Sequence, residues 1–438
     1  MKITILAVGT RGDVQPYIAL GQGLRAAGHE VWVAAASNFE GFVREFGLHY
    51  ARLDASFRDL LQSDALQQAM TSRNPIQRQR EVLRMVHHSL ELFAAGTWEV
   101  CQGADAIIYS TIAVTAYSVA EKLGVPCFWA PLMPVTRTRF FPSLTTPLGN
   151  GRSGLLNWLS HLIEEQAAWQ PARSFVNQWR RQTLNLKPFP FWGPYGLLEE
   201  RRLPVLYGFS AHVVPRPADW SERIHVTGYW FLDSLDGWQP PDGLVDFIEA
   251  GPPPVYIGFG SMFSRDAEAT TRIVVEALRR CGQRAVLATG WDSLGGVELP
   301  ETVFQIDSAP HDWLFPRMAA VVHHGGAGTT AAGLRAGVPS VIVPFAADQP
   351  FWAQRVYELG AGVRPVPHQK LSAERLAEAV SAAVSSSQLR RRAAAIGERI
   401  REENGVARAV EIVQDVVCSN AGENGQRVRD RAILPQRT

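Results

Sequence analysis

The sequence predicts an α/β protein made of two Rossmann-like units, each a doubly wound parallel sheet. Strand-like apolar runs alternate with segments of helical periodicity near the start of the chain, and the alternation restarts after residue 254. Glycine-rich turns follow strands in both halves. The chain has 438 residues, of which 46% are hydrophobic and 19% charged, so it can fill at least two cores. A net charge of +1 disfavours a nucleic-acid-binding protein.

The first unit begins with an expected strand at Ile3–Val8, a glycine turn, a helix that starts at Val14 and a strand at Val31–Ala35. These elements form a βαβ unit. The alternation then continues through helices at Asn38–Phe46 and Ala113–Leu123 and strands at Leu48–Leu53, Ala106–Tyr109 and Cys127–Ala130.

Residues 131–217 differ from the flanking sequence because they are rich in Pro, Trp and Phe, with one amphipathic helix expected around Leu155–Gln182. We interpret this stretch as an insertion on one face of the first unit. Residues 238–254 contain five prolines and are typical of a linker with one short helix.

The second unit repeats the βα alternation. Its expected strands are Val255–Phe259, Ala285–Ala288, Val303–Ile306, Ala319–His323 and Ser340–Val343, and its expected helices are Ala267–Cys281, Gly328–Ala336, Phe351–Leu359, Ser372–Val384 and Leu389–Glu403. We predict a first domain over residues 1–235, a linker over 236–254, a second domain over 255–403, a helix over 404–418 and a flexible tail over 419–438.

The sequence contains no clear signal for export, membrane insertion or a redox-active cysteine pair. The four cysteines include no C-x-x-C pair, no apolar run approaches the ~20 residues of a membrane span, and Met1–Val8 is too short for a signal-peptide core. We therefore expect a cytoplasmic protein without a transmembrane segment.

The first glycine loop, residues 9–13 (GTRGD), lies where the first strand meets the first helix. It lacks the spacing G-x-G-x-x-G, and no acidic residue ends the second strand, so an NAD-dependent enzyme is disfavoured. Asp13 has two interpretations: it caps the helix that starts at Val14, or it is a functional carboxylate at the mouth of a cleft.

Residues 323–330 (HHGGAGTT) form the strongest motif, because three glycines follow an apolar strand and open a helix. A helix N-terminus exposes unpaired N–H groups and carries partial positive charge, so it suits a diphosphate. The lysine of an ATP-binding loop is absent, and a tight turn capped by threonines is the alternative. The turn at Gly260 and Ser261 is a weaker candidate for an anion contact.

Asp348 and Gln349 follow the next strand. A neighbouring carboxylate and carboxamide can bind the vicinal hydroxyls of a sugar, since acceptors and donors then lie side by side. In the alternative interpretation, Asp348 caps a helix that begins near Pro350.

These residues together resemble a known family. Residues 308–314, the HHGGAGTT motif, residues 331–345 and the pair Asp348-Gln349 resemble the donor-site signature of family 1 glycosyltransferases. The loop GTRGDVQPYIALGQGL and Leu206–Asp233 are similar to the branch that contains sterol 3-β-glucosyltransferases and bacterial aglycone glycosyltransferases. The resemblance implies the GT-B fold, in which two Rossmann-like domains face each other across a cleft, with the final helix crossing back onto the first domain. It also implies inverting transfer from a nucleoside-diphosphate sugar without a bound metal; no D-x-D triplet occurs in the chain.

The resemblance assigns roles residue by residue. Asp13 falls on the position of the general base, and His324 on the phosphate-contacting histidine. The family's stacking tryptophan falls on Ser308 and its ribose-binding glutamate on Ala332, which leaves both UDP and dTDP sugars open. Our full set of donor-site candidates is Gly260, Ser261, His311, Trp313, His324, Gly326, Gly328, Thr329, Asp348 and Gln349.

The resulting hypothesis is transfer of a hexose, with glucose favoured, to a hydroxyl of a bulky apolar acceptor such as a sterol, triterpene or polyketide. Trp129, Phe140, Phe141 and Trp169 are the acceptor candidates, because the Trp- and Phe-rich insertion suits a flat apolar ligand. A nucleotide-sugar epimerase on the same fold and a non-catalytic sugar-nucleotide-binding protein remain alternatives. We expect no metal, no other cofactor and no nucleic-acid partner, and for a sterol acceptor we allow transient membrane contact.

Overall fold

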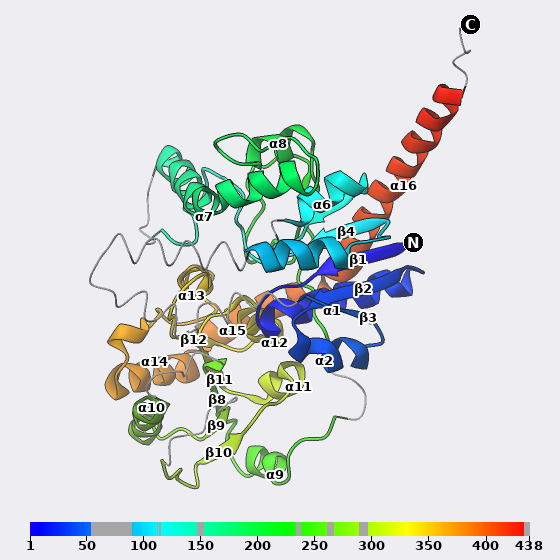
Figure 1. Ribbon diagram of the computed structural model, residues 1–438. Helices are drawn as coiled ribbons and strands as arrows, with labels where there is room; N and C mark the ends of the chain where they lie inside the picture. Colours follow the sequence, from blue (N-terminus) through cyan, green and yellow to red (C-terminus); the bar gives the residue numbers. More distant parts are fainter. Residues whose placement is uncertain are drawn as a thin grey trace, which may run out of the picture.

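The computed structural model describes residues 1–53, 90–111, 113, 115–146, 153–233, 238–260, 267–288 and 297–432, with side chains up to residue 419. Its strands form two parallel sheets with flanking helices, which confirms the predicted fold class (Figure 1).

The first sheet has seven strands in the order β3-β2-β1-β4-β5-β6-β7. Ile3 and Ile5 of β1 (Lys2–Leu6) belong to one buried cluster and Leu6 to another, as expected for a parallel sheet covered on both sides. The strands are β1 (Lys2–Leu6), β2 (Glu30–Ala35), β3 (His49–Arg52), β4 (Ala106–Tyr109), β5 (Cys127–Trp129), β6 (Val205–Tyr207) and β7 (Ile224–Val226).

Helices cover both faces of this sheet. One face carries α1 (Arg11–Ala26) and α2 (Glu40–Glu45), which follows the 3-10 turn η1 (Ser37–Phe39). The opposite face carries α6 (Ala116–Leu123) and the second half of α7 (Gly154–Gln182), with α8 (Tyr195–Glu200) beside them.

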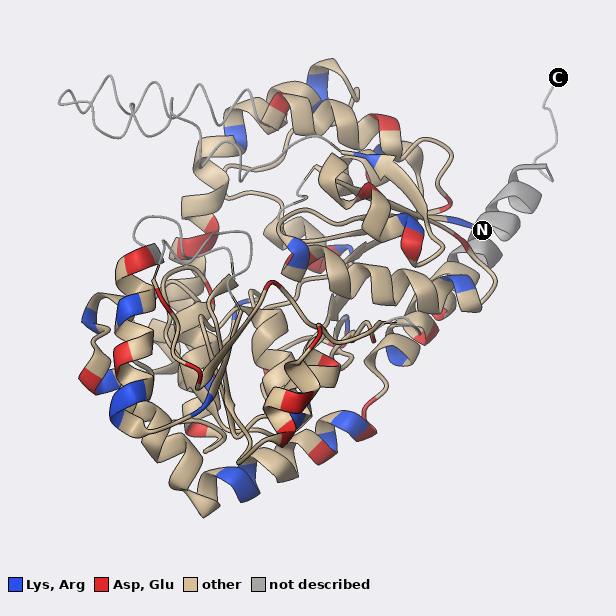
Figure 2. Cartoon of the chain, turned by 90° about the horizontal axis from the view of Figure 1, so that it is seen from below, with Lys and Arg blue, Asp and Glu red and all other residues tan. Residues whose placement is uncertain are grey.

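The second sheet has five strands in the order β10-β9-β8-β11-β12. They are β8 (Val255–Gly258), β9 (Ala285–Ala288), β10 (Val303–Ile306), β11 (Ala320–His323) and β12 (Ser340–Ile342). Around it lie α9 (Leu244–Glu249), α10 (Ala267–Cys281), α11 (His311–Leu314), η3 (Phe315–Arg317), α12 (Ala327–Ala336), α13 (Gln349–Glu358), η4 (His368–Lys370), α14 (Ala373–Ser385) and α15 (Ser387–Glu402). Positive and negative residues are interspersed along these outer helices (Figure 2).

The last helix, α16 (Gly405–Ala432), leaves the second unit and packs on α1 of the first. A Cβ atom on Gly23 of α1 would lie 2.4 Å from Val406, so this glycine permits the close approach of the two helices. The helix continues past residue 418, its predicted end, to Ala432. The predicted domain boundaries remain a prediction.

The two units share an apolar interface. Phe209, Val213 and Tyr229 of the first unit belong to the same buried cluster as Phe351 and Trp352 of α13. Polar contacts frame it: Arg335 of α12 forms an ion pair with Asp233, and the Ser210 hydroxyl donates to Glu403 over 2.9 Å. Apolar packing and polar contacts therefore join the two units.

Candidate active site

Asp13 lies in the first turn of α1, directly after β1. The helix begins at Arg11, so Thr10 is its N-cap and Asp13 is the third helical residue, which corrects the interpretation of Asp13 as the cap. Asp13 Oδ2 accepts hydrogen bonds from the Thr10 N–H (2.7 Å) and hydroxyl (2.9 Å), which completes a capping box. Gly9, with φ of +138°, brings the backbone so close that a Cβ there would lie 2.4 Å from Oδ2.

The Asp13 carboxyl is a weaker acid than an ordinary aspartate side chain. Burial raises its pKa, and the two hydrogen bonds from Thr10 offset part of that rise. A carboxylate with a raised pKa is a better proton acceptor at neutral pH than an exposed aspartate.

The glycine-rich motif opens α12 as predicted, with Gly326 as N-cap. The N-terminus of α12 meets the N-terminus of α1: a Cβ on Gly328 would lie 3.8 Å from the Gly12 carbonyl oxygen (Figure 1). Two helix ends with partial positive charge therefore converge at one place, which favours an anion there. The Thr329 side chain lies in the same turn.

His323 and His324 precede this turn and differ in their surroundings. The Nδ1 atom of buried His323 accepts from the Gly325 N–H over 3.1 Å. His324 lies against two glycines, since a Cβ on Gly326 would be 2.5 Å from its Nε2 and one on Gly260 would be 3.5 Å from its Cε1. Burial lowers the pKa of His324 to about 4, so it is neutral, and its buried Nδ1 has no hydrogen-bond partner in the described part of the chain. A ligand oxygen or N–H could satisfy that atom.

Asp348 occupies the N-cap position of α13, but its side chain makes no capping hydrogen bond. Its Oδ2 accepts instead from the indole Nε1–H of Trp352 over 2.8 Å. The preceding Ala347 has φ of +56°, a left-handed conformation that is strained for a residue with a side chain. Burial raises the pKa of Asp348 to about 6; the Trp352 hydrogen bond lowers it, and the charge of Asp13 raises it further. Asp13 and Asp348 therefore interact across the two units.

The oxygen of the Gln349 side chain is hydrogen-bonded within its own loop. The side-chain Oε1 accepts from the N–H groups of Phe345 (2.8 Å) and Ala346 (3.2 Å), so it fixes the loop before α13. Its amide nitrogen is the group that can donate to a sugar hydroxyl.

His311 joins this group of residues and Trp313 does not. The His311 ring stacks on Phe315 with centroids 4.2 Å apart. Burial lowers the pKa of His311 to about 4, and the charge of Arg11 from the first unit lowers it as well. The Trp313 ring packs instead against Trp238, with ring centroids 5.2 Å apart, and the guanidinium carbon of Arg317 lies 4.4 Å from its centroid. Ser261 lies outside the described residues.

The four acceptor candidates lie in different surroundings. Phe141 packs on Trp220 and, across the interface, on Phe351 of α13 with centroids 5.9 Å apart. Trp129 is half-buried at the end of β5. Phe140 is 62% exposed. Trp169 is buried within the insertion, where its indole donates to the Phe191 carbonyl over 2.9 Å, so it stabilises the insertion's core.

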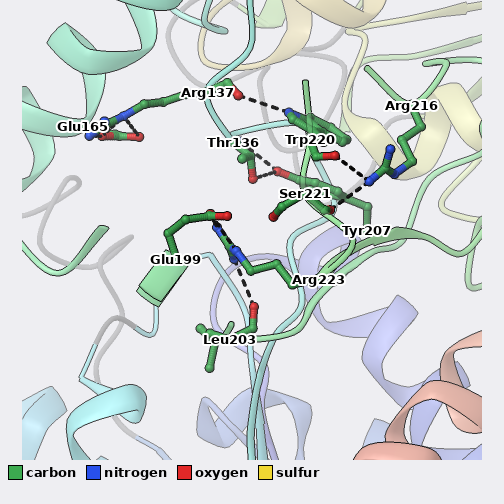
Figure 3. Close-up of polar contacts among 10 residues, drawn as sticks. All are labelled: Thr136, Arg137, Glu165, Glu199, Leu203, Tyr207, Arg216, Trp220, Ser221 and Arg223. Carbon is green, nitrogen blue, oxygen red and sulfur yellow. Dashed lines mark hydrogen bonds and ion pairs between the residues drawn. The ribbon is translucent and has the colours of Figure 1, made fainter. Parts of the chain in front are cut away.

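A polar network holds the segment that carries Phe140 and Phe141 (Figure 3). The Tyr207 hydroxyl accepts from the Thr136 N–H over 2.8 Å, and the Trp220 indole donates to the Arg137 carbonyl over 3.2 Å. Arg137 also pairs with Glu165 of α7 through Nε at 2.8 Å. The segment is thus tied both to β6 and to the insertion helix. Elsewhere in the same view, Arg216 and Arg223 bind backbone carbonyls of residues 203–224, and Arg223 pairs with Glu199.

A shallow pocket adjoins the Asp348 loop. It lies between the two units, and its described lining is mainly apolar: Leu144, Thr145, Thr146, Pro344, Ala347, Pro350, Gln354, Arg364, Pro365 and Pro367.

Comparison with known proteins gives relatives over almost the whole chain. It is 40% identical over 423 residues to sterol 3-beta-glucosyltransferase UGT80B1 of Arabidopsis thaliana, covering 94% of this chain and 67% of the relative. It is also 40% identical over 437 residues to a sterol 3-beta-glucosyltransferase of Cryptococcus neoformans, of which the chain spans only 27%. The chain belongs to this glycosyltransferase family.

Family profiles agree with that assignment. Residues 3–142 match the glycosyltransferase family 28 N-terminal domain, and residues 275–418 match the erythromycin biosynthesis protein CIII-like C-terminal domain. The former match spans the Asp13 loop, and the latter spans the HHGGAGTT motif and Asp348.

Solved structures of glycosyltransferases share the fold. The calicheamicin glycosyltransferase CalG4 superposes with a TM-score of 0.67 at 19% identity, covering 94% of this chain and 97% of that one. The glycosyltransferase SsfS6 of Streptomyces sp. SF2575, solved with thymidine diphosphate, superposes with a TM-score of 0.63 at 21% identity. The match covers 95% of this chain and 99% of that one. These likenesses confirm the GT-B fold.

The sequence pattern assigned no role to two residues of this candidate site, Thr10 and Trp352. Thr10 and Asp13 have the spacing of a capping box, and that signal could have placed the helix start at Arg11. Trp352 carries no such signal, because an aromatic residue one turn into a helix is ordinarily part of the core.

Neither a metal cluster nor a membrane span is found in the part of the chain that the structure describes. No group of three or more His, Cys, Asp or Glu side chains there is arranged to hold a metal ion. No helix within the described residues is long and apolar enough to cross a bilayer.

Proposed function

We propose that the protein transfers a hexose from a nucleoside-diphosphate sugar to a hydroxyl group of a bulky apolar acceptor. The transfer inverts the anomeric centre and uses no metal ion. The observation that carries the proposal is the convergence of the N-termini of α1 and α12, which brings Asp13 of the first unit to the glycine-rich turn of the second. The relatives named sterol 3-beta-glucosyltransferase favour glucose and a sterol-like acceptor.

In the proposed reaction, the acceptor oxygen attacks the anomeric carbon in a single displacement. The bond from that carbon to the diphosphate oxygen breaks, and its electron pair leaves with the nucleoside diphosphate. Asp13 takes the proton of the acceptor hydroxyl, which its raised pKa favours. A single displacement at one carbon inverts its configuration.

The leaving diphosphate gains charge during this step. We assign its stabilisation to the N–H groups at the start of α12, to Thr329 and to the neutral ring of His324, whose buried Nδ1 otherwise lacks a partner among the described residues. Asp348 would accept from sugar hydroxyls and the Gln349 amide would donate to them, which holds the anomeric carbon in line with Asp13.

The acceptor would lie between the units, near Phe141 and the apolar pocket beside the Asp348 loop. Flat fused-ring molecules suit such walls because they bury large apolar area with little loss of conformational entropy. The buried position of Trp169 removes it from this proposal.

The test is a screen of the purified protein against UDP- and dTDP-hexoses with a panel of sterols, triterpenes and polyketides, read by mass spectrometry. A glycosylated acceptor with release of the nucleoside diphosphate is the expected result. Conversion of the donor into an isomeric sugar nucleotide without acceptor would show an epimerase. Tight donor binding with no turnover on any acceptor would show a binding protein.

A further inference from the structure

The orientation of Asp348 is set by an unusual partner. An aspartate at an N-cap position ordinarily accepts from N–H groups in the first helical turn. Asp348 makes no such bond, and Pro350 removes one of those donors. The carboxylate turns to the indole of Trp352, one helical turn further on, with Nε1 2.8 Å from Oδ2.

Trp352 in turn is held by both units. Its side chain is fully buried, and it meets Phe351 of its own helix edge-on at 5.2 Å. From the first unit, Phe209 packs against it with ring centroids 6.2 Å apart, and Tyr207 packs on Phe209 at 4.8 Å. A series of packed aromatic rings therefore connects the sheet of the first unit to Trp352, and the Trp352 indole connects it to the Asp348 carboxylate of the second unit.

We propose that Trp352 is a positioning residue for sugar transfer. Its indole N–H orients the Asp348 carboxylate, and its contact with Phe209 makes that orientation depend on the apposition of the two units. The value of this orientation for catalysis rests on the proposed function, in which Asp348 binds the sugar. The bond between indole and carboxylate itself does not depend on that function.

The hydrogen bond has a measurable electrostatic consequence. A donor to a carboxylate stabilises its ionised form, and here it opposes the rise in the pKa of Asp348 that burial causes. Removal of the donor should therefore raise the pKa of Asp348 further, by about one to two units, given the strength of a hydrogen bond to a charged group.

The first experiment needs no activity. In protein labelled with ¹⁵N at the tryptophan indoles, the resonance absent from the spectrum of Trp352→Phe identifies Trp352. We expect this resonance to titrate in the wild type with a midpoint near pH 6, the pKa of Asp348, and to lose that titration in Asp348→Asn. A resonance that does not titrate in the wild type, or that titrates unchanged in Asp348→Asn, would overturn the proposed bond.

The second experiment separates positioning from core packing. The Trp352→Phe variant keeps a ring in the buried site but lacks the N–H group. We expect the acidic limb of its kcat/KM for donor to move up by about one to two pH units, with a roughly five- to fifty-fold loss at pH 6, where the wild-type carboxyl is half ionised.

The matched control is Val356→Ala, one turn further along α13 in the same buried cluster. It should lower the melting temperature while leaving the acidic limb in place. An unmoved limb in Trp352→Phe, or an equal shift in Val356→Ala, would refute the positioning role. If the wild type transfers no sugar from any donor, the proposed function fails, and the indole titration still decides whether the bond exists.

Discussion

Replacement of Asp13 by asparagine should abolish most turnover while leaving the fold and donor binding intact. In the structure, the Asp13 carboxylate accepts from the N–H and hydroxyl of Thr10. The side-chain oxygen of asparagine can accept from the same N–H, so the capping box and the start of α1 survive. What asparagine cannot do is take a proton from the acceptor.

The expected loss follows from that difference. Removal of a general base reduces the rate by about 10²- to 10⁴-fold, which corresponds to ~3–5 kcal/mol of transition-state stabilisation. Initial rates come from mass-spectrometric product formation at saturating acceptor. Calorimetric titration with the nucleotide sugar and a melting curve check binding and fold.

The matched control is Asp105→Asn. Asp105 also accepts a backbone N–H, from Lys2 over 2.7 Å, but at the opposite end of β1. It should retain wild-type turnover. Wild-type-like rates in Asp13→Asn, or an equal loss in both variants, would refute the assignment of Asp13 as the base.

Three further outcomes follow from the site. Asp348→Asn should weaken binding of the intact nucleotide sugar or its turnover by about one to two decades, with affinity for the free nucleoside diphosphate nearly unchanged; equal loss of both affinities would contradict the sugar contact. The same variant should melt higher than the wild type at pH 8, because the pKa of Asp348 is raised to about 6 in the folded state and its ionisation above that pH therefore opposes folding; a lower melting point would contradict the raised pKa. Activity should survive exhaustive chelation by EDTA, and loss of activity that only Mg²⁺ or Mn²⁺ restores would contradict the proposed role of the α12 N-terminus and His324.

The sequence predicted the regular parts of the fold closely. Ala106–Tyr109, Ala285–Ala288 and Val303–Ile306 are strands with the expected bounds, because each is a short, mainly apolar run between polar residues. The strands β6 and β7 were not predicted. Each has three residues and lies in a stretch rich in proline and tryptophan, so tertiary pairing and not local pattern defines them.

The site was predictable where backbone geometry makes strong demands on sequence. Glycine is required before α12 and at residue 9, because a Cβ atom there would clash with neighbouring side chains. These required glycines form motifs that can be recognised in the sequence. Contacts between side chains that are distant in the sequence produce no such motif. The bond from Trp352 to Asp348 and the packing of Phe209 on Trp352 belong to the interface between the units, and the burial of Trp169 belongs to the core of the first unit. The sequence pattern encodes none of these contacts locally.

The most direct test of the central claim is the configuration of the product. The purified protein is incubated with an α-linked UDP- or dTDP-hexose and the acceptor found by the screen, and the product's anomeric configuration is determined by nuclear magnetic resonance. Direct displacement assisted by Asp13 predicts a β-glycoside in the wild type and about 10²- to 10⁴-fold slower formation of the same product in Asp13→Asn. An α-glycoside, or a sugar nucleotide altered without transfer to any acceptor, would contradict it.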